Sequence, residues 1–254
     1  MEILKARNLT KIYGSENGEE STRALNRISF SVDSGEFVGI MGPSGSGKTT
    51  LLNMISGVDK LTSGQVSIND RDICEMSKNE LALFRRKEIG YVFQDFNLLD
   101  SLTLKENIML PMILDKKPAE EMEKKARELM KLFEIYNIAN KYPYNISGGQ
   151  QQRVAVSRAL INNPSIIFAD EPTGNLDSKS SKGIMQCFEK MNTELKATIL
   201  VVTHDVFAAS YCNRVIFIKD GKIHSEIVKK TTRKEFLDSI FNSLAVLGGE
   251  SYDL

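Results

Sequence analysis

The sequence lacks several features that would point to particular classes of protein. It has no tryptophan, only two histidines and only three cysteines in 254 residues. Cys74, Cys187 and Cys212 are far apart and show neither the paired spacing of a zinc site nor that of a disulfide framework. We therefore expect these cysteines to be reduced and structural.

The sequence also lacks a long hydrophobic run and an excess of either charge. No segment approaches the ~18 consecutive apolar residues that a membrane-spanning helix needs. The N-terminal stretch "MEILKARNLT" carries charges at positions 2, 5 and 7, unlike a signal peptide. Basic and acidic residues number 33 each, so no global field attracts nucleic acid or acidic lipid. These absences predict a cytosolic, water-soluble protein that binds no nucleic acid and reaches a membrane only through a partner.

Short apolar runs alternate with amphipathic helical patterns, which is typical of a sheet covered by helices. Buried strands are predicted over 36–41, 165–170 and 198–203, and "RISFSV" adds a strand within the first 35 residues. The stretch "VIFIKDGKIHSEI" predicts two strands joined at Asp220 and Gly221 by a type I′ turn. The fold class is therefore α/β.

The middle of the chain has a different pattern. The run 118–133, "PAEEMEKKARELMKLF", begins with proline, has glutamates in its first turn and places apolar residues along one helical face. A second apolar stripe, from Ile184 to Leu195, predicts another helix. We expect a helical subdomain over about 95–160, inserted into the mixed α/β core of a domain that spans 1–230. Residues 231–254 are expected to form a short amphipathic helix and a polar tail.

A glycine-rich phosphate loop stands between the strand at 36–41 and the helix that follows it. The motif fits G-x-x-x-x-G-K-[ST] in the strand-to-helix context that it requires. Backbone N–H groups of such a loop curl around phosphates, its lysine contacts the β and γ phosphates, and its threonine binds Mg²⁺. The candidate ligands of ATP are Gly42, Pro43, Ser44, Gly45, Ser46, Gly47, Lys48, Thr49 and Thr50.

Two adjacent carboxylates end the apolar strand at 165–170. Unpaired carboxylates are costly at the end of such a dry strand, and a bound Mg²⁺ and a water would supply their missing partners. Asp170 is predicted to hold Mg²⁺ and Glu171 to act as general base toward the attacking water. A plain pair of surface acids is the alternative interpretation.

Three further residues are ambiguous by themselves. Gln94 follows a short apolar run and is compatible with an ordinary loop glutamine. His204 follows another strand, where a structural histidine would also fit, and Tyr13 in "KIYG" is compatible with core or turn. Local pattern does not choose between these possibilities.

Together the motifs resemble those of the ATP-binding subunits of ABC transporters. The resemblance covers nearly the whole chain and rests on "GPSGSGKT", "ISGGQQQR", "IIFADEPTGNLDS" and "THD", in the order and spacing of that family. It implies a P-loop NTPase fold with a mixed sheet core, an antiparallel β subdomain and an inserted helical subdomain. It also implies ATP and Mg²⁺ as cofactors.

The resemblance assigns roles that spacing alone does not. Tyr13 corresponds to the aromatic residue that stacks on adenine, and His204 to the residue that contacts the γ-phosphate. Gln94 corresponds to the glutamine that senses Mg²⁺ and the lytic water while touching the permease. Asp177 lies in the loop that crosses between two nucleotide-binding domains.

A second anion site is predicted at the start of the helix that follows "ISGG". Its groups are the Ser147 hydroxyl and the backbone of Gly148, Gly149 and Gln150, at the positive end of a helix dipole. In the resembling family these residues complete the nucleotide site of the facing subunit, which gives two composite ATP sites in a symmetric homodimer. Hydrolysis is therefore expected to depend on dimer closure.

"EPTGNLDS" resembles the branch of macrolide-export, lipoprotein-release and cell-division ATPases, and "FQDFNLLDSLTLKENIMLP" and the closing "LAVLGG" resemble its bacitracin-resistance type. This predicts a subunit at the cytoplasmic face of the membrane that drives an antimicrobial-peptide permease and is coupled to a sensor histidine kinase. The segment 91–111 is expected to face the permease, although the apolar "FNLLDSL" also suits local core. A non-transport ATPase switch for a cell-division or signalling partner, or a lipoprotein-release or macrolide-export ATPase, is the alternative.

Overall fold

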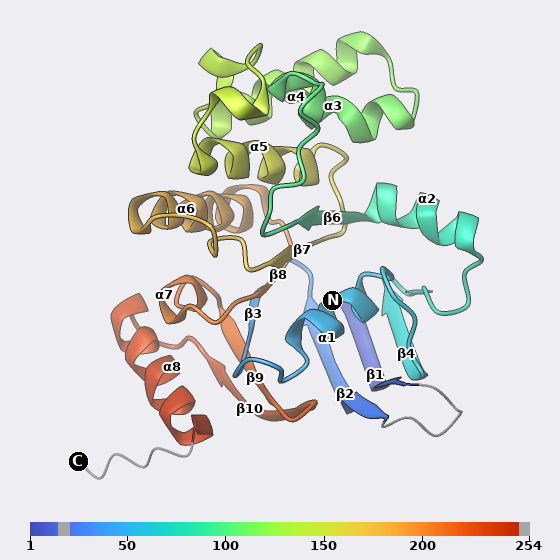
Figure 1. Cartoon of the computed structure of the whole chain (residues 1–254), viewed down its shortest axis with the longest axis vertical. Helices are drawn as coiled ribbons and strands as arrows, with labels where there is room; N and C mark the ends of the chain where they lie inside the picture. Colours follow the sequence, from blue (N-terminus) through green and yellow to red (C-terminus); the bar gives the residue numbers. More distant parts are fainter. Residues whose placement is uncertain (15–20, 249–254) are drawn as a thin grey trace.

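A six-stranded mixed sheet forms the centre of the computed structural model, which describes residues 1–14 and 21–248. Its order is β10-β9-β3-β8-β7-β6, with β10 antiparallel to β9 and the other pairs parallel. The sheet runs through the middle of Figure 1. Its strands are β3 (Phe37–Met41), β6 (Ile89–Val92), β7 (Ile166–Asp170), β8 (Ile199–Val202), β9 (Arg214–Lys219) and β10 (Lys222–Val228).

The central strands are apolar on both faces because both faces are covered. In β3, Val38 and Ile40 join one buried cluster, whereas Phe37 and Met41 join the other. This period of two is the geometry of a strand packed on both sides. The three strands predicted from apolar runs are confirmed, as is the hairpin, whose turn residues Asp220 and Gly221 both have positive φ (50° and 69°).

A second, antiparallel sheet with the order β2-β1-β4-β5 lies beside the first, at the lower right of Figure 1. Helix α1 (Lys48–Ile55) packs its apolar residues into the cluster shared by the two sheets. The predicted early strands are confirmed, and residues 15–20 lie outside the described residues. The strands are β1 (Glu2–Tyr13), β2 (Thr22–Asp33), β4 (Ser63–Ile68) and β5 (Arg71–Asp72).

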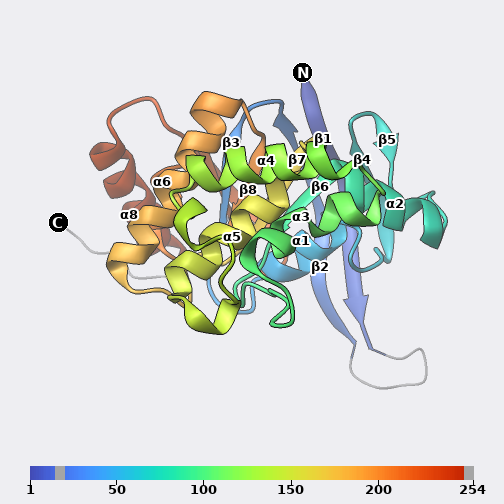
Figure 2. The ribbon, with the colours of Figure 1, turned by 90° about the horizontal axis from the view of Figure 1, so that it is seen from above.

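Three helices of the middle segment pack on one another, and the last of them also packs on β6 of the central sheet. They are α3 (Leu104–Leu114), α4 (Ala119–Leu132) and α5 (Gly148–Leu160). Figure 2, which looks down from above, shows them side by side in front of the sheet. The helix predicted over 118–133 is confirmed as α4, with Pro118 as its N-cap. Two 3₁₀ turns, Tyr136–Ile138 and Pro143–Asn145, complete this part, whereas helix α2 (Lys78–Glu88) packs on β6 and buries Phe84 in the cluster shared by the two sheets.

The remaining helices are α6 (Ser178–Leu195), α7 (Val206–Ala209) and α8 (Arg233–Gly248). The predicted C-terminal helix is confirmed as α8, which buries Phe236, Ile240 and Leu247 in the same cluster as α6 and α7. The predicted tail lies outside the described residues from 249 onward. Within the described ranges, no helix is long and apolar enough to cross a bilayer.

Two sequence-based expectations need correction or refinement. The apolar stripe of α6 is buried only as far as Met191, because the helix ends in solvent and leaves Leu195 48% exposed. In "FNLLDSL", Leu98 packs against the core whereas Leu99 is 46% exposed, so the segment is partly core and partly surface.

A shielded arginine of β9 joins β10, β2 and the residue that precedes β3. The Arg214 guanidinium donates from Nε to Glu36 Oε1 (2.6 Å), from Nη1 to Glu226 Oε2 (3.0 Å) and from Nη2 to the Ser31 carbonyl (2.7 Å). Its side chain is 13% exposed. We expect Arg214→Met to lower the free energy of unfolding by about 3 kcal/mol, because Glu36 keeps a poorly solvated charge without its counter-ion.

Urea unfolding followed by circular dichroism measures this loss. The matched control is Arg127→Met, which removes an exposed arginine of α4 and should change stability by no more than about 0.5 kcal/mol. Equal effects of the two substitutions would contradict a structural role for Arg214.

Candidate active site

Four neighbouring strands bring the predicted site residues to one edge of the central sheet. In the order β3-β8-β7-β6, parallel strands place all their carboxyl ends together. The phosphate loop follows β3, His204 follows β8, Asp170 and Glu171 end and follow β7, and Gln94 follows β6. Residues from four separate parts of the sequence thus meet at one edge.

The phosphate loop leads directly into α1. Gly47 is the N-cap residue at φ 99°, and a Cβ on it would lie 2.5 Å from the Ala24 carbonyl, so only glycine fits. Ser46 is buried, and its hydroxyl has no hydrogen-bond partner among the described residues. A loop with spare donors at a helix N-terminus is suited to bind phosphate.

A cavity of about 540 Å³ opens at this loop. Ser44, Gly45 and Thr50 form one side, and Glu171 closes another. The other lining residues are Gly47 to Thr49, Thr22 to Ala24 of β2 and the Asp220–Gly221 turn. The cavity therefore joins the candidate phosphate ligands to the candidate base.

The Lys48 ammonium is bound by backbone carbonyls of the phosphate loop. Its Nζ donates to the carbonyls of Gly42 and Pro43, each at 2.9 Å, and only 9% of the residue is exposed. Burial lowers the pKa of this ammonium, and the nearby charges of Glu171 and Asp170 oppose that shift. An incoming phosphate would add an anionic hydrogen-bond partner to a cation whose hydrogen bonds, within the described residues, go to carbonyls.

Asp170 and Thr49 lie next to each other across two elements. The Thr49 hydroxyl is 3.5 Å from Asp170 Oδ1. Burial and, next, the charge of Glu171 raise the pKa of Asp170, while Thr49 and Lys48 act in the opposite direction. A positive charge placed between these oxygens would stabilise the ionised carboxylate.

The oxygen donors here suit Mg²⁺. A hydroxyl and a carboxylate are hard ligands, and Mg²⁺ commonly takes one or two protein oxygens together with substrate phosphates and water. Across the described part of the chain, no three His, Cys, Asp or Glu side chains converge as an all-protein metal cage would require. Thr49 and Asp170 therefore fit a magnesium ion that arrives with a nucleotide.

The Glu171 carboxylate is held by two contacts with His204. The histidine backbone N–H donates to Glu171 Oε2 (3.3 Å), and its ring Nδ1 lies 2.9 Å from Oε1. Glu171 has a left-handed backbone (φ 44°), which is uncommon for a residue with a side chain and marks a position under constraint. Its side chain is 16% exposed, whereas that of His204 is 72% exposed.

Gln94 pairs with a residue that the sequence did not single out. Its Nε2 lies 3.3 Å from Asn175 Oδ1, and Asn175 Nδ2 donates to Asp95 Oδ1 (2.8 Å). Asn175 belongs to the "GNLDS" loop, so this contact joins the loop after β6 to the loop after β7. An amide in a loop gives no pattern from which such a partner could be predicted.

The second predicted anion site caps α5. Ser147 and Gln150 form a reciprocal capping box, in which Ser147 Oγ accepts from Gln150 N and Gln150 Oε1 accepts from Ser147 N. A Cβ on Gly149 would lie 2.9 Å from Ser180 Oγ, so glycine lets α6 approach this turn. Gly148 likewise lies beside Leu176.

None of the described walls of the phosphate-loop cavity comes from residues 147–150. The two anion sites of one chain are therefore distinct. This separation agrees with the prediction that the second site serves another copy.

Asp177 begins α6. Its carboxylate accepts from the backbone of Lys179 and Ser180 and, at 2.6 Å, from the Ser180 hydroxyl. These bonds, led by that of the hydroxyl, lower the pKa of Asp177. In this structure Asp177 shapes its own loop, and contact with a facing subunit stays a prediction.

Tyr13 ends β1 and is 42% exposed. Its hydroxyl donates to Asp59 Oδ2 (3.3 Å), and the Lys11 ammonium lies 4.8 Å from the ring centroid. The ring is available to stack on a base, although it is not among the described walls of the phosphate-loop cavity. Stacking on adenine stays a prediction.

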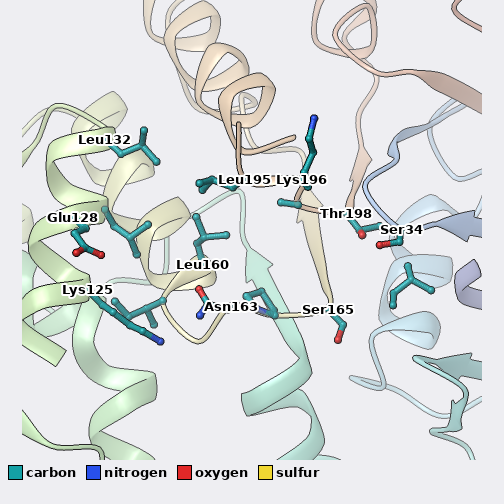
Figure 3. A pocket seen from close by; sticks show the side chains of 15 residues that line it. Ser34, Lys125, Glu128, Leu132, Leu160, Asn163, Ser165, Leu195, Lys196 and Thr198 are labelled. Atoms are coloured by element: carbon teal, nitrogen blue, oxygen red, sulfur yellow. The ribbon is translucent and has the colours of Figure 1, made fainter. Parts of the chain in front are cut away.

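A larger cavity lies elsewhere. A hollow of about 750 Å³ is lined by Leu132, Leu160 and Leu195, with Asn163, Ser165 and Thr198 toward the sheet (Figure 3). Ser165 and Thr198 immediately precede β7 and β8, so this hollow is at the amino ends of the strands. It contains none of the predicted site residues, and size alone does not identify the active site.

Comparison with known proteins gives a consistent result. A sequence model described as ABC transporter matches residues 25–174. The chain is 53% identical to an uncharacterized ABC transporter ATP-binding protein of Bacillus subtilis, YvcR, over 100% of this chain and 98% of that protein. It is 48% identical to the bacitracin export ATP-binding protein BceA of Halalkalibacterium halodurans, over 100% of both chains.

A solved structure matches the fold as well. The ATP-binding cassette MJ0796 of Methanocaldococcus jannaschii, as a dimer in a post-hydrolysis state bound to ADP and Pi, has a TM-score of 0.81 and 45% identity. The match covers 90% of this chain and 100% of that chain. The predicted α/β cassette fold, with its mixed sheet, antiparallel sheet and helices, is confirmed.

Proposed function

Because the chain belongs to the ABC transporter family, we propose that it binds ATP between two copies of itself and drives a permease that handles antimicrobial peptides. Family membership makes it an ATP-binding and ATP-hydrolysing subunit coupled to transport, working as a dimer with a membrane permease. The peptide substrate, the residue roles, Mg²⁺, a position at the cytoplasmic face of the membrane and a sensor histidine kinase are our proposals. We also propose an ATP-binding domain of 1–230, with a helical subdomain over about 95–160 and an extension from 231.

The convergence of Lys48, Thr49, Asp170 and Glu171 at one edge of the sheet is the observation that carries this proposal. Lys48 is buried with its ammonium on loop carbonyls, and Thr49 is within 3.5 Å of Asp170. Neither a structural glycine turn nor a pair of surface acids requires these residues to meet. Binding and hydrolysis of a nucleoside triphosphate require all four side chains at one place.

Each residue has a distinct role in the proposed reaction. The phosphate loop and Lys48 hold the β and γ phosphates in line, which is most of what phosphoryl transfer requires of a protein. Glu171 accepts a proton from the attacking water, and His204 keeps its carboxylate oriented and faces the γ-phosphate. Thr49, Asp170 and Gln94 would hold Mg²⁺, which when bound supplies positive charge to the phosphates.

The nucleotide site of one copy is completed by the other. Ser147, Gly148, Gly149 and Gln150 form a capped helix N-terminus that is separate from the phosphate-loop cavity of the same chain. A head-to-tail dimer would set this helix end opposite the γ-phosphate held by the partner. Two composite sites would then close together, with Asp177 near the crossing between subunits.

Tyr13 provides a test of the nucleobase contact. We expect Tyr13→Ala to raise the KM for ATP about tenfold, because stacking of an aromatic ring on a base contributes ~1–3 kcal/mol. The kcat at saturating ATP should stay unchanged. Tyr13→Phe is the matched control, since it keeps the ring and removes only the hydrogen bond to Asp59. A matching loss of kcat would mean that Tyr13 does more than bind the base.

The peptide assignment rests on similarity to the bacitracin export protein, and the permease tests it. The chain should be purified together with its permease, and ATP turnover measured with and without bacitracin. We expect bacitracin or a related cell-wall-active peptide to stimulate turnover, whereas macrolides and lipoproteins should not. Stimulation by a macrolide or a lipoprotein would replace the peptide proposal and leave the ATPase assignment intact.

A further inference from the structure

A buried amide on α5 joins the backbone beside two proposed site residues. Gln152 is 0% exposed, and its Nε2 donates to the carbonyls of Phe93 (3.2 Å) and Pro172 (2.8 Å). Phe93 immediately precedes Gln94, and Pro172 immediately follows Glu171. One side chain therefore bridges the flanks of the proposed magnesium-sensing glutamine and the proposed base.

The Gln152 amide lies just beyond the last residues that β6 and β7 pair with each other. Strands β6 and β7 are paired in register as far as Val92 and Ala169. Beyond this pair β6 has ended, and β7 continues only to Asp170, which pairs with β8, so no ladder pair joins the segments at Phe93 and Pro172 to each other. The amide of Gln152 supplies two donors at this point, so a side chain links the two segments where the strand pairing has ended.

The orientation of the amide is determined by these two bonds. Both carbonyls require a donor, so only the nitrogen of Gln152 fits between them. Its oxygen, Oε1, is buried and has no partner among the described residues. A buried acceptor without a partner is unfavourable, so the packing of the interior alone does not account for a glutamine here.

The same helix holds the other side of Gln94. Arg158 donates from Nη2 to the Phe96 carbonyl (2.8 Å) and from Nη1 to that of Asn97 (2.5 Å). Phe96 and Asn97 both have left-handed backbones, with φ 59° and 49°. Helix α5 thus grips the loop before and after Gln94, and its first turn is the proposed anion site for the facing ATP.

We propose that Gln152 is a positioning residue that fixes Gln94 and Glu171 relative to each other and ties both to the helix that faces the partner nucleotide. This inference rests on the roles proposed above for Gln94 and Glu171. A movement of α5 on dimer closure would then shift Glu171 and Gln94 together, because the Gln152 amide is bonded to the backbone beside both.

Gln152→Met tests the inference, because methionine has similar length and no donors. We expect kcat for ATP to fall about 10- to 100-fold, the scale of a displaced catalytic group. The KM for ATP should stay within about twofold, since Gln152 makes no hydrogen bond to the phosphate loop among the described residues. A folded variant with unchanged kcat would overturn the inference.

Asn192→Leu is the matched control. Asn192 Nδ2 also bridges two backbone carbonyls, those of Gly35 (2.7 Å) and Ala197 (3.0 Å), at the amino ends of the strands. Its loss should lower stability while kcat and KM are retained. If both variants lower kcat equally, Gln152 has only a structural role.

A double-mutant cycle keeps the inference testable if Gln152→Met folds poorly. Gln152→Asn retains an amide that is one methylene too short, and it is combined with Gln94→Ala. We expect the double variant to lose less kcat than the product of the two single losses, because both act through the position of Gln94. Multiplicative losses would overturn the inference. Glu171→Gln, measured in parallel, tests the base itself, so failure of that role is distinguishable.

Discussion

Glu171→Gln is expected to lower ATP turnover by about 10²- to 10⁴-fold, the usual contribution of a general base. Glutamine preserves the shape of the side chain and can still contact the His204 ring, which lies 2.9 Å from Glu171 Oε1. It cannot accept the proton of the attacking water. ATP should therefore bind, and the dimer should close around it, without cleavage.

Steady-state phosphate release measures the loss of turnover, and size-exclusion chromatography with ATP measures the trapped dimer. The control is Glu123→Gln, which neutralises a carboxylate in the ion pair with Lys105 on the helical part of the molecule. It should retain full turnover and show no trapped dimer. Unchanged turnover in Glu171→Gln would refute its role as base, and loss of ATP binding would show that the carboxylate serves binding instead.

Mixing two inactive variants is expected to restore activity if each site draws on both chains. A Lys48→Ala homodimer and a Ser147→Ala homodimer each carry two damaged sites. In their heterodimer, one site contains both substitutions and the other contains neither. An equal mixture should regain up to about a quarter of wild-type turnover, because half of the dimers are mixed and each has one intact site of two.

The matched control mixes the Lys48→Ala chain with a chain that carries both Lys48→Ala and Ser147→Ala. No arrangement of those chains yields an intact site, so turnover should stay at the level of the homodimers. If Ser147 served the phosphate loop of its own chain, the first mixture would also show no recovery. The separation of Ser147 from the phosphate-loop cavity leads us to expect recovery.

The sequence was most informative where burial is complete. β3, β7 and β8 are covered on both faces, so their residues form apolar runs that predict strands directly. The phosphate loop was predictable because its backbone geometry admits few residues. His204 and Gln94 became interpretable only through the family pattern, because a polar residue after a strand has no unique meaning.

Other parts escaped prediction for physical reasons. Helix α2 buries only Phe84, so its apolar periodicity is weak, although its capping box of Ser77 and Glu80 was a usable signal. The contacts of Gln152 and Asn175 depend on how two strands diverge. Leu195 belongs to the predicted apolar stripe of α6 yet is exposed, because helical spacing does not show where a helix leaves its partner.

Strand β3 has consequences for how the protein is made. Its two neighbours, β8 and β9, lie in the last quarter of the chain, whereas the phosphate loop begins immediately after β3. During synthesis on the ribosome, the loop therefore emerges long before the strands that flank its base. A chain released before Arg214 would contain the whole loop yet present one bare, apolar edge of β3, which favours aggregation or capture by chaperones.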